Sequence, residues 1–393
     1  MRFIHTSDLH LGRRLAQMSL EKDCAHVLNQ LAQLVAQSDS HALVVAGDVF
    51  DSPNPSEVAV RQWDRFITGM AQSRVPVLVV SGNHDSGARL SVASNIIALS
   101  GVHLVGELRH NLEPVVVEDV NFWLIPFVRP ADVRMWATRM ELDPGLVINY
   151  DTGLRLVLDY VRASDAFAKR PNVCVAHQFV TNSGVAPERS DSEHLSLGTL
   201  DNVDVSAFEG FDYVALGHVH RPQRVGRDTV RYAGSPLKLS SSEVTQSKSF
   251  AVVDIQDTAN ETSVTYRLVP VEPLRDFRME RGSVDELVRA GKQEDERRRN
   301  DFVHAVVTDD DPIDVVARLR HVWPNLEQVS FDNATTRAAG VSEAPTEVDF
   351  KKDMRSLFAE FFEAQAGRPL ATDEQRLADD AFETVLTEGG DLV

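Results

Sequence analysis

Five clusters of polar residues, rich in aspartate and histidine, each follow a short apolar run. Asp, His and Asn side chains of this kind bind divalent metal ions of intermediate softness. The clusters are SDLH (7–10), GDVFD (47–51), GNHD (82–85), the single His177 and GHVH (217–220). The candidate ligands in them are Asp8, His10, Asp48, Asn83, His177, His218 and His220. They are too many for one tetrahedral ion, and they suit two ions about 3.5–4 Å apart that share a carboxylate, an arrangement used to hydrolyse phosphate esters.

Each cluster alone also has an ordinary structural explanation. A DxH sequence is usually a surface turn, and GDVFD or GNHD suits the turn that ends a strand. A lone histidine is usually a satisfied core residue, and GHVH can be an exposed strand end. All five clusters follow apolar runs, and this shared position favours a single site that they form together. Gly47, Gly82 and Gly217 add to this, since glycine lets the backbone turn sharply and approach an ion or a phosphate closely.

The apolar runs that precede the clusters predict buried strands of a layered α/β domain. These runs are short and rich in valine, and they cover residues 3–4, 42–46, 75–80, 173–176 and 213–216. Between the first three, residues 21–36 and 57–71 have the apolar spacing of helices. Residues 121–127 and 250–255 predict further strands of this domain, which we expect to end near Val269. Ligands of open α/β sheets bind beyond the carboxyl ends of the strands, where all the clusters fall.

A smaller unit over residues 270–332 follows the first domain. Ser283 is a suitable N-cap for one of its helices, and Pro312 suits the first turn of another. A charged run at 292–300 predicts a solvated loop or helix end. The predicted elements are strands at 276–280, 301–309 and 326–331 and helices at 283–290 and 311–324.

The C-terminal residues predict a linker and then a pair of helices. Residues 333–348 are small and polar, which is typical of a linker. Within residues 349–393, two apolar stripes predict helices, of which the first ends before Gly367 and the second opens at Thr372 with a capping box. Two short helices bury too little apolar surface to be stable alone. We therefore expect them to dock either on the main body or on a partner protein.

The composition limits the class of protein. The chain has 393 residues and a formal net charge of −19, which argues against a role in coating DNA through phosphate contacts. A nuclease remains compatible with this charge, because bound metal ions reverse the local field. No apolar run is long enough to span a membrane and no signal segment opens the chain, so we expect a cytoplasmic protein. Cys24 and Cys174 lie in apolar surroundings and are expected to be reduced core residues.

The ordered motifs resemble those of the calcineurin-like metallophosphoesterase superfamily. Within it, the segments RFIHTSDLHLGRRL, GDVFDSPNPS and RYAGSPLKLSSSE are similar to the SbcD family, which supplies the nuclease subunit of the bacterial SbcCD complex. This resemblance covers nearly the whole chain. It implies a layered α/β fold, a β-sandwich flanked by helices, with a nuclease domain at 1–269, a small α+β DNA-capping domain at 270–332 and a C-terminal helical tail.

The resemblance also implies a role for each site residue. Asp8, His10, Asp48 and His220 hold one metal ion, and Asp48, Asn83, His177 and His218 hold the other, so that Asp48 bridges the pair. The ions are divalent, with manganese as the usual metal of the family. His84 stays off the metals and faces the scissile phosphate as a catalytic residue. Archaeal and eukaryotic relatives tend to carry histidine where this chain has Asp51, which we expect to support the site.

The activity implied is that of a DNA nuclease, an exonuclease on double strands and an endonuclease on single strands and hairpins. It would act in DNA end processing and recombination, with water activated by the two ions. Residues 349–393 would bind an SbcC-type coiled-coil ATPase, which would supply ATP because no GxxxxGK[ST] loop occurs here. A homodimer within a heterotetramer is implied as well, and Arg13 and Arg14 are candidates for DNA phosphate contacts. The alternatives are a nucleotide or protein phosphatase of the same superfamily and a non-catalytic scaffold at DNA ends.

Overall fold

A computed structural model describes most of the chain before residue 334. The described ranges are 1–193, 202–258, 262–310 and 312–333, with residues 358, 362, 368–371 and 374–378 nearer the C-terminus. The chain divides into two compact units, Met1–Ala334 and Thr335–Val393. Nearly all of the predicted linker and helical tail (333–393) therefore lies outside the described residues. The expected boundary near Val269 falls inside the first unit and stays a prediction.

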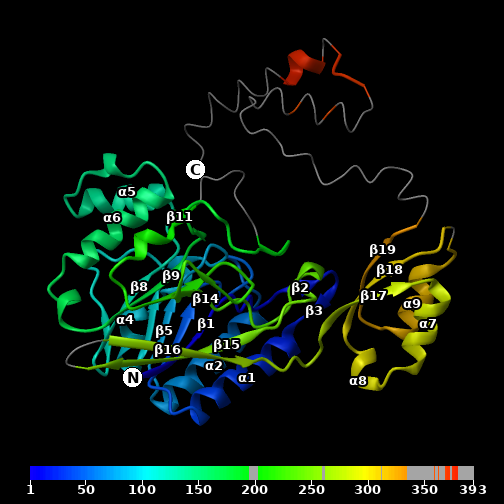
Figure 1. Cartoon of the computed structure of the whole chain (residues 1–393), viewed down its shortest axis with the longest axis horizontal. Coiled ribbons are helices and arrows are strands. Elements are labelled where there is room, and N and C mark those ends of the chain that lie inside the picture. The colour runs from blue at the N-terminus through cyan, green and yellow to red at the C-terminus, as the bar shows by residue number, and fades with distance from the viewer. Residues whose placement is uncertain are drawn as a thin grey trace. The chain divides into compact units, whose positions relative to one another are not determined.

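Two large mixed sheets lie face to face in the described part of the first unit (Figure 1). The first has the strand order β16–β15–β1–β4–β5–β6, and its central strands β1, β4, β5 and β6 are parallel. Their bounds are β1 (Arg2–Thr6), β4 (Ala42–Ala46), β5 (Val77–Val80), β6 (Val102–Val105), β15 (Ser249–Asp257) and β16 (Thr262–Pro270). The strand predicted from residue 75 begins at Val77, after Pro76, because proline has no N–H to donate to a ladder.

The second sheet has the order β13–β14–β12–β9–β8–β7, with β14, β12, β9 and β8 parallel. Its strands are β7 (Val115–Val117), β8 (Val120–Ile125), β9 (Asn172–His177), β12 (Tyr213–Gly217), β13 (Gln223–Val225) and β14 (Arg227–Tyr232). Apolar side chains from both sheets meet between them. There Phe3 of β1 packs edge-on against Phe122 and Tyr213, with ring centroids 5.3 and 5.6 Å away.

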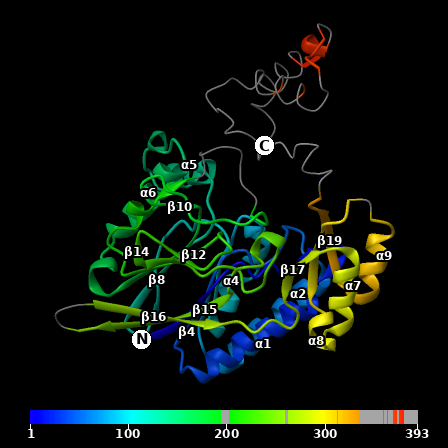
Figure 2. The ribbon, with the colours of Figure 1, turned by 45° about the vertical axis from the view of Figure 1, so that its right-hand side comes forward.

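Helices cover the outer face of each sheet, which confirms the expected sandwich flanked by helices (Figure 2). On the first sheet these are α1 (Glu21–Gln37) and α2 (Glu57–Ser73), close to their predicted bounds. On the second they are α5 (Pro130–Arg139) and α6 (Tyr150–Arg162). Shorter elements in the connections are β2 (Arg14–Leu15), β3 (Met18–Ser19), α3 (Gly87–Leu90), α4 (Ser94–Ile97), η1 (Ala98–Ser100), η2 (Pro144–Leu146), η3 (Phe167–Lys169), β10 (Val180–Thr181), β11 (Val203–Asp204), η5 (Val205–Phe208) and η6 (Ser241–Glu243).

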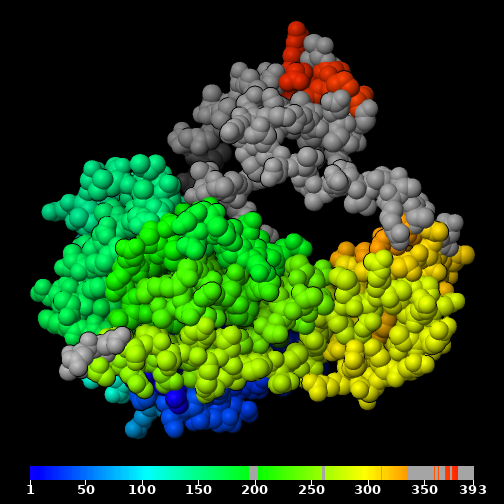
Figure 3. Space-filling model, viewed as in Figure 1, coloured from blue at the N-terminus to red at the C-terminus, as the bar shows by residue number. Residues whose placement is uncertain are grey.

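A third, small sheet contains β17 (Phe277–Gly282), β18 (Phe302–Val307) and β19 (Leu326–Phe331), all parallel. Figure 3 shows this region, coloured yellow to orange, beside the main body. Its helices are α7 (Val284–Gln293), α8 (Glu296–Arg299) and α9 (Val315–Val322). Ser283 caps α7 as predicted, and its hydroxyl accepts a hydrogen bond from the Glu286 N–H. The helix predicted from residue 311 starts only at Val315, because Asp314 has a left-handed backbone with φ 53° and forms its N-cap; Pro312 thus lies outside the helix.

Both cysteines are buried and free, as expected, and burial raises the pKa of Cys24 to about 12. In the part of the chain that the structure describes, no helix is both long and apolar enough to cross a membrane.

His5, which lies outside the polar clusters, is a structural histidine in the core. It lies on β1 without solvent exposure, between the Tyr213 hydroxyl (3.1 Å from Nδ1) and the Leu216 carbonyl (3.2 Å from Nε2). The carbonyl accepts from Nε2–H, so Nδ1 accepts from the tyrosine. Burial, helped by the charge of Arg231, lowers the pKa of His5 to about 3. The folded chain therefore holds this ring neutral.

The buried His5 predicts a specific pH dependence of stability. Below its unfolded pKa of about 6.5 the unfolded chain binds a proton that the folded chain does not, so stability present above that pH is lost as pH falls, by about 1.4 kcal/mol per pH unit. Replacing His5→Gln should reduce the slope of unfolding free energy between about pH 6.5 and 5 by that amount. Urea denaturation with EDTA measures it, with His41→Gln at an exposed histidine as the matched control. An unchanged slope in His5→Gln would contradict the assignment.

Candidate metal centre

The fold brings the five polar clusters to one edge of the sandwich. Three follow the parallel strands β1, β4 and β5 of the first sheet, and two follow β9 and β12 of the second. Backbone hydrogen bonds join the first two loops, from the Asp8 N–H to the Gly47 carbonyl at 3.0 Å and from the His10 N–H to the Asp48 carbonyl at 3.1 Å. All the predicted ligands lie in this group. Their roles as ligands remain a prediction that the geometry supports.

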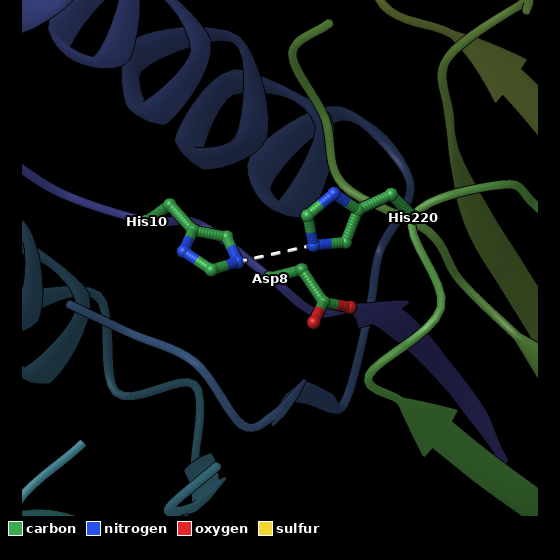
Figure 4. Close-up of side chains that lie close together, drawn as sticks. All are labelled: Asp8, His10 and His220. Carbon is green, nitrogen blue, oxygen red and sulfur yellow. Dashed lines mark hydrogen bonds between the residues drawn. The ribbon is translucent and has the colours of Figure 1, made fainter. Parts of the chain in front are cut away.

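One group of side chains joins β1 to the loop after β12. Ligand atoms of Asp8, His10 and His220 lie within 4.8 Å of one another (Figure 4). The three side chains are almost fully buried, and the Nε2 atoms of His10 and His220 are 3.2 Å apart. Two nitrogens that each bind one tetrahedral ion at its usual bond length lie about 3.4 Å apart. The spacing therefore suits a cation shared by both rings.

A second group forms around Asn83. Its Oδ1 lies 2.9 Å from His177 Nε2 and 2.8 Å from His218 Nδ1. Asp48 joins this group to the first, since its Oδ2 is 3.3 Å from His177 Nε2 and 3.7 Å from His10 Nε2. Asp48 thus has the position of a bridging carboxylate between two cation sites. The residues present fit the pair of ions that the sequence predicted.

Three histidines have a hydrogen-bond partner at Nδ1. These partners orient each ring so that its Nε2 atom faces the metal centre. His177 Nδ1 donates to the Ala46 carbonyl at 2.9 Å, and His10 Nδ1 lies 3.2 Å from the Asp51 carboxylate. His220 Nδ1 is 2.7 Å from the Ser192 hydroxyl and 3.4 Å from Glu243. A hydrogen-bonded Nδ1–H leaves the Nε2 lone pair for a metal ion. Asp51 therefore has the supporting position expected of it.

His84 lies beside the first group but is held by other contacts. Its Nδ1 donates to the Asp51 carbonyl at 2.9 Å, and its N–H donates to Asp48 Oδ1 at 2.8 Å. A ligand atom of His84 also lies within 4.8 Å of ligand atoms of His10 and Asp48. Because Nδ1 is occupied, Nε2 is the atom through which His84 would act. Arg13, a candidate for DNA contact, pairs with Asp51 at 3.2 Å.

The loops of the centre pack too tightly for side chains at Gly47, Gly82 and Gly217. A Cβ on Gly82 would lie 2.0 Å from Asp48 Oδ1, and one on Gly217 would lie 1.8 Å from the Ala46 carbonyl oxygen. The sequence suggested that these glycines let the backbone approach an ion or a phosphate. In the structure, the atoms close to them are instead protein atoms. Left-handed backbone adds to the constraint, with φ of 53° at Asp8, 48° at Asp48 and 104° at His218. Such conformations persist where the surrounding structure imposes them.

The buried charges of the centre compensate one another. Burial would lower the pKa of His177, but the Asp48 carboxylate raises it to about 9. Burial likewise opposes ionisation of Asp48, yet the neighbouring imidazoles, led by His177, hold its pKa below the usual range. A cation bound at Nε2 of His177 would replace the proton that Asp48 now stabilises.

Asp85 belongs to the GNHD cluster, but no role was predicted for it. Its half-buried carboxylate accepts hydrogen bonds from the N–H groups of Gly82 (2.9 Å), Phe50 (2.9 Å) and Val49 (3.1 Å), and so ties the loop after β5 to the loop after β4. Burial, and then the charge of Asp48, raises the pKa of Asp85 to about 6. The GNHD motif was the feature of the sequence that could have pointed to Asp85.

A buried network behind His220 was also missed. Glu243 accepts from the Ser192 hydroxyl and pairs with Lys248 at 2.5 Å. Lys248 also donates to the His220 carbonyl at 2.9 Å. Glu193 Oε1 accepts from the His220 N–H at 2.9 Å. Glu243 ends the RYAGSPLKLSSSE segment, but no local pattern links it to Ser192, far earlier in the chain.

Comparison with known proteins identifies the family of the chain. Residues 1–222 match the model of the calcineurin-like phosphoesterases. The chain belongs to the calcineurin-like phosphoesterase family. Residues 273–366 match a second family model, described as a type 5 capsule protein repressor C-terminal domain.

Relatives within this family confirm the resemblance to SbcD proteins. The chain is 28% identical to the SbcD subunit of the SbcCD nuclease of Staphylococcus epidermidis, over 94% of this chain and 95% of that protein. It is 26% identical to the corresponding protein of Staphylococcus saprophyticus, over 99% and 100%. A crystal structure of TT1561 of Thermus thermophilus is similar at 13% identity and a TM-score of 0.34, over 67% of this chain and 97% of that one. A dimetal phosphatase from Danio rerio is similar at 13% identity and a TM-score of 0.42, over 69% and 98%.

The network behind His220 predicts an effect on metal binding. In Glu243→Gln, an amide replaces the carboxylate that contacts Ser192 and His220. The Mn²⁺ affinity of one site should therefore fall about tenfold or more. Titration calorimetry with Mn²⁺ measures the loss, and Glu113→Gln, at an exposed glutamate, is the control. A circular dichroism spectrum checks that the variant is folded, because Lys248 loses its partner. Wild-type affinity at both sites in a folded Glu243→Gln would show that Glu243 does not orient His220.

Proposed function

We propose that this chain is a metal-dependent DNA nuclease subunit that hydrolyses phosphodiesters at a two-cation centre. The observation that carries the proposal is the position of Asp48 between two groups of imidazole and amide ligands, at 3.7 Å from His10 and 3.3 Å from His177. Membership in the phosphoesterase family supports hydrolysis of a phosphate ester. The similarity to the SbcD subunits of two staphylococcal SbcCD nucleases, over nearly the full length, favours a nuclease over a phosphatase.

In this proposal, each ion has four ligands from the chain. Asp8, His10, Asp48 and His220 would hold one, and Asp48, Asn83, His177 and His218 would hold the other. When bound, two divalent ions such as Mn²⁺ would supply the activation of water at neutral pH and would neutralise charge on the phosphate.

Other residues of the chain orient this centre and handle the proton. His84 presents Nε2 to the scissile phosphate and stabilises the departing oxygen. Asp51 keeps Nδ1 of His10 protonated and takes no direct part in the reaction. Asp85 holds the two loops that carry Asp48 and Asn83 at a fixed separation.

The proposed substrates are DNA ends and hairpins. The chain would act as an exonuclease on double strands and an endonuclease on single strands, in end processing and recombination. An SbcC-type coiled-coil ATPase would bind the segment 349–393, most of which lies outside the described residues, and would supply the ATP dependence. The small unit that begins near residue 270 would cap the DNA.

We propose that the chain works as a homodimer, because large apolar side chains are exposed along one short stretch of it. Val92 lies in the turn before α4, Ile96 is on α4 and Leu99 is on η1, with exposed fractions of 66%, 71% and 88%. Monomeric proteins seldom expose such clusters without a binding role.

The dimer proposal makes a prediction about mass. Ile96→Asp combined with Leu99→Asp should halve the mass measured by light scattering after gel filtration, because two charges would be buried in the interface. Leu146→Asp, at another exposed apolar position, should keep the wild-type mass. A wild-type chain that is monomeric at tens of micromolar would refute this interface.

The nuclease proposal predicts that substitutions at His84 and at Asp48 have different effects on activity and metal content. With Mn²⁺, wild-type protein should degrade end-labelled duplex DNA and hydrolyse bis(p-nitrophenyl) phosphate. His84→Gln should keep two Mn²⁺ per chain and lose activity about 100-fold or more, because it removes only the acid. Asp48→Asn should lose metal together with activity. Metal content is measured by atomic emission after gel filtration.

Four results would contradict these assignments. Parallel loss of metal and activity in His84→Gln would make His84 a ligand. Full occupancy in Asp48→Asn would exclude the bridging role. Hydrolysis of phosphomonoesters without any cleavage of DNA would favour a phosphatase, and an absence of both activities would favour a scaffold.

A further inference from the structure

A hollow of about 370 Å³ lies beside the proposed metal centre, on the side of Asn83. The loop after β5 supplies Gly82 and Asn83 to its wall. Asn83 Oδ1 is at the same time 2.9 Å from His177 Nε2 and 2.8 Å from His218 Nδ1. Anything bound in the hollow is therefore one side chain away from the second group of ligands. No role has been given to this space so far.

One face of α5 forms the opposite wall. Asp132, Met135, Trp136 and Arg139 line the hollow, and their spacing of three, four and seven residues places them on one side of the helix. Trp136 is buried, whereas Met135 is 54% exposed. A helix that exposes a long apolar side chain toward a hollow offers a contact surface to a ligand with an apolar face.

An aromatic ring stands between the hollow and the metal centre. Phe127, which lines the hollow, has its ring centroid 6.3 Å from that of His177, edge-on at 82°. On another side it lies 6.3 Å from the ring of Tyr150. These neighbours fix the plane of the phenyl ring, which is half-buried. A fixed ring beside a cationic centre is the kind of platform on which single-stranded nucleic acids stack their bases.

The hollow is lined by charges of both signs, two arginines among them. Arg129 and Arg139 line it, and neither forms an ion pair with a carboxylate in the ranges the structure describes. Two of its acidic groups are engaged by backbone: Asp132 accepts from the Arg129 N–H at 3.0 Å, and Asp85 accepts from three N–H groups. Glu107 is the acidic residue that remains on the rim. Three carboxylates therefore line the hollow with the two arginines, and the arginines are the groups that can bind the phosphate of a ligand.

We propose that this hollow binds one nucleotide of the DNA strand next to the phosphate that is hydrolysed. The base stacks on Phe127 and contacts Met135, and Arg129 and Arg139 bind the sugar-phosphate backbone. The volume of about 370 Å³ is near the lower end of the range for small-molecule pockets, about 300 to 1,000 Å³, and suits a single nucleotide better than a peptide. The inference rests on the proposed nuclease function and specifies where its substrate binds.

The test compares a nucleotide with the same molecule lacking its base. Titration calorimetry of the full-length, Mn²⁺-loaded chain measures the affinities of dAMP and of 2-deoxyribose 5-phosphate. Wild-type protein should bind dAMP about tenfold more tightly, because only dAMP can stack. Phe127→Leu should remove this preference. Arg139→Ala should weaken both ligands about tenfold, because it removes a charged hydrogen-bond donor.

Two controls separate the hollow from the metal centre. Phe127 contacts His177, so Mn²⁺ content must be measured for Phe127→Leu, and Met135→Ala, on α5, gives a second variant that should reduce the preference for dAMP. Arg65→Ala, at an exposed arginine on α2, should leave both affinities unchanged.

Equal binding of dAMP and the sugar phosphate by wild-type protein would overturn the proposal. So would dAMP binding that Arg139→Ala and Phe127→Leu both leave unchanged. Failure of the nuclease proposal has a different signature, namely no cleavage of duplex DNA by the wild-type chain. A preference for dAMP that depends on Phe127 and Arg139 would support the nucleotide site whatever the cleavage assay shows.

Discussion

The buried carboxylate of Asp48 is the constraint around which the centre is built. A carboxylate removed from water must be compensated, or its burial costs several kcal/mol. Here it lies between the imidazoles of His10 and His177 and accepts the N–H of His84. The glycine at position 82 exists beside it because no Cβ fits there. A single charge thus dictates the backbone of two loops and the placement of histidines from three clusters.

The layered fold matters because neither sheet carries the centre alone. The loops after β1, β4 and β5 bring aspartate and asparagine, and those after β9 and β12 bring most of the histidines. Contacts such as that between Asn83 and His177 exist only while the two sheets keep their packing, which rests on side chains such as Phe3, Phe122 and Tyr213. Packing in the sandwich core is therefore directly coupled to the geometry of the site.

Much of this arrangement could be predicted from the sequence, because buried valine-rich strands and the polar residues after them are local patterns. The rest depends on partners distant in the chain. Glu243 meets Ser192 only in the folded chain, and the hollow beside Asn83 requires α5, which the sequence did not reveal. The strand β16 was missed because its edge position leaves many of its residues exposed. Pro312 suggested a helix start that the left-handed backbone of Asp314 shifts to Val315.

The left-handed backbone at Asp8, His10, Asp48 and His218 has an evolutionary consequence. Glycine adopts this backbone without the steric penalty that side chains suffer. Substituting it at these positions would relieve backbone strain. At the two aspartates it would also remove carboxylates that compensate buried imidazoles and backbone N–H groups, so the two effects on stability oppose each other. The strained backbone is thus retained together with the ligands it carries, the usual trade-off between robustness and function.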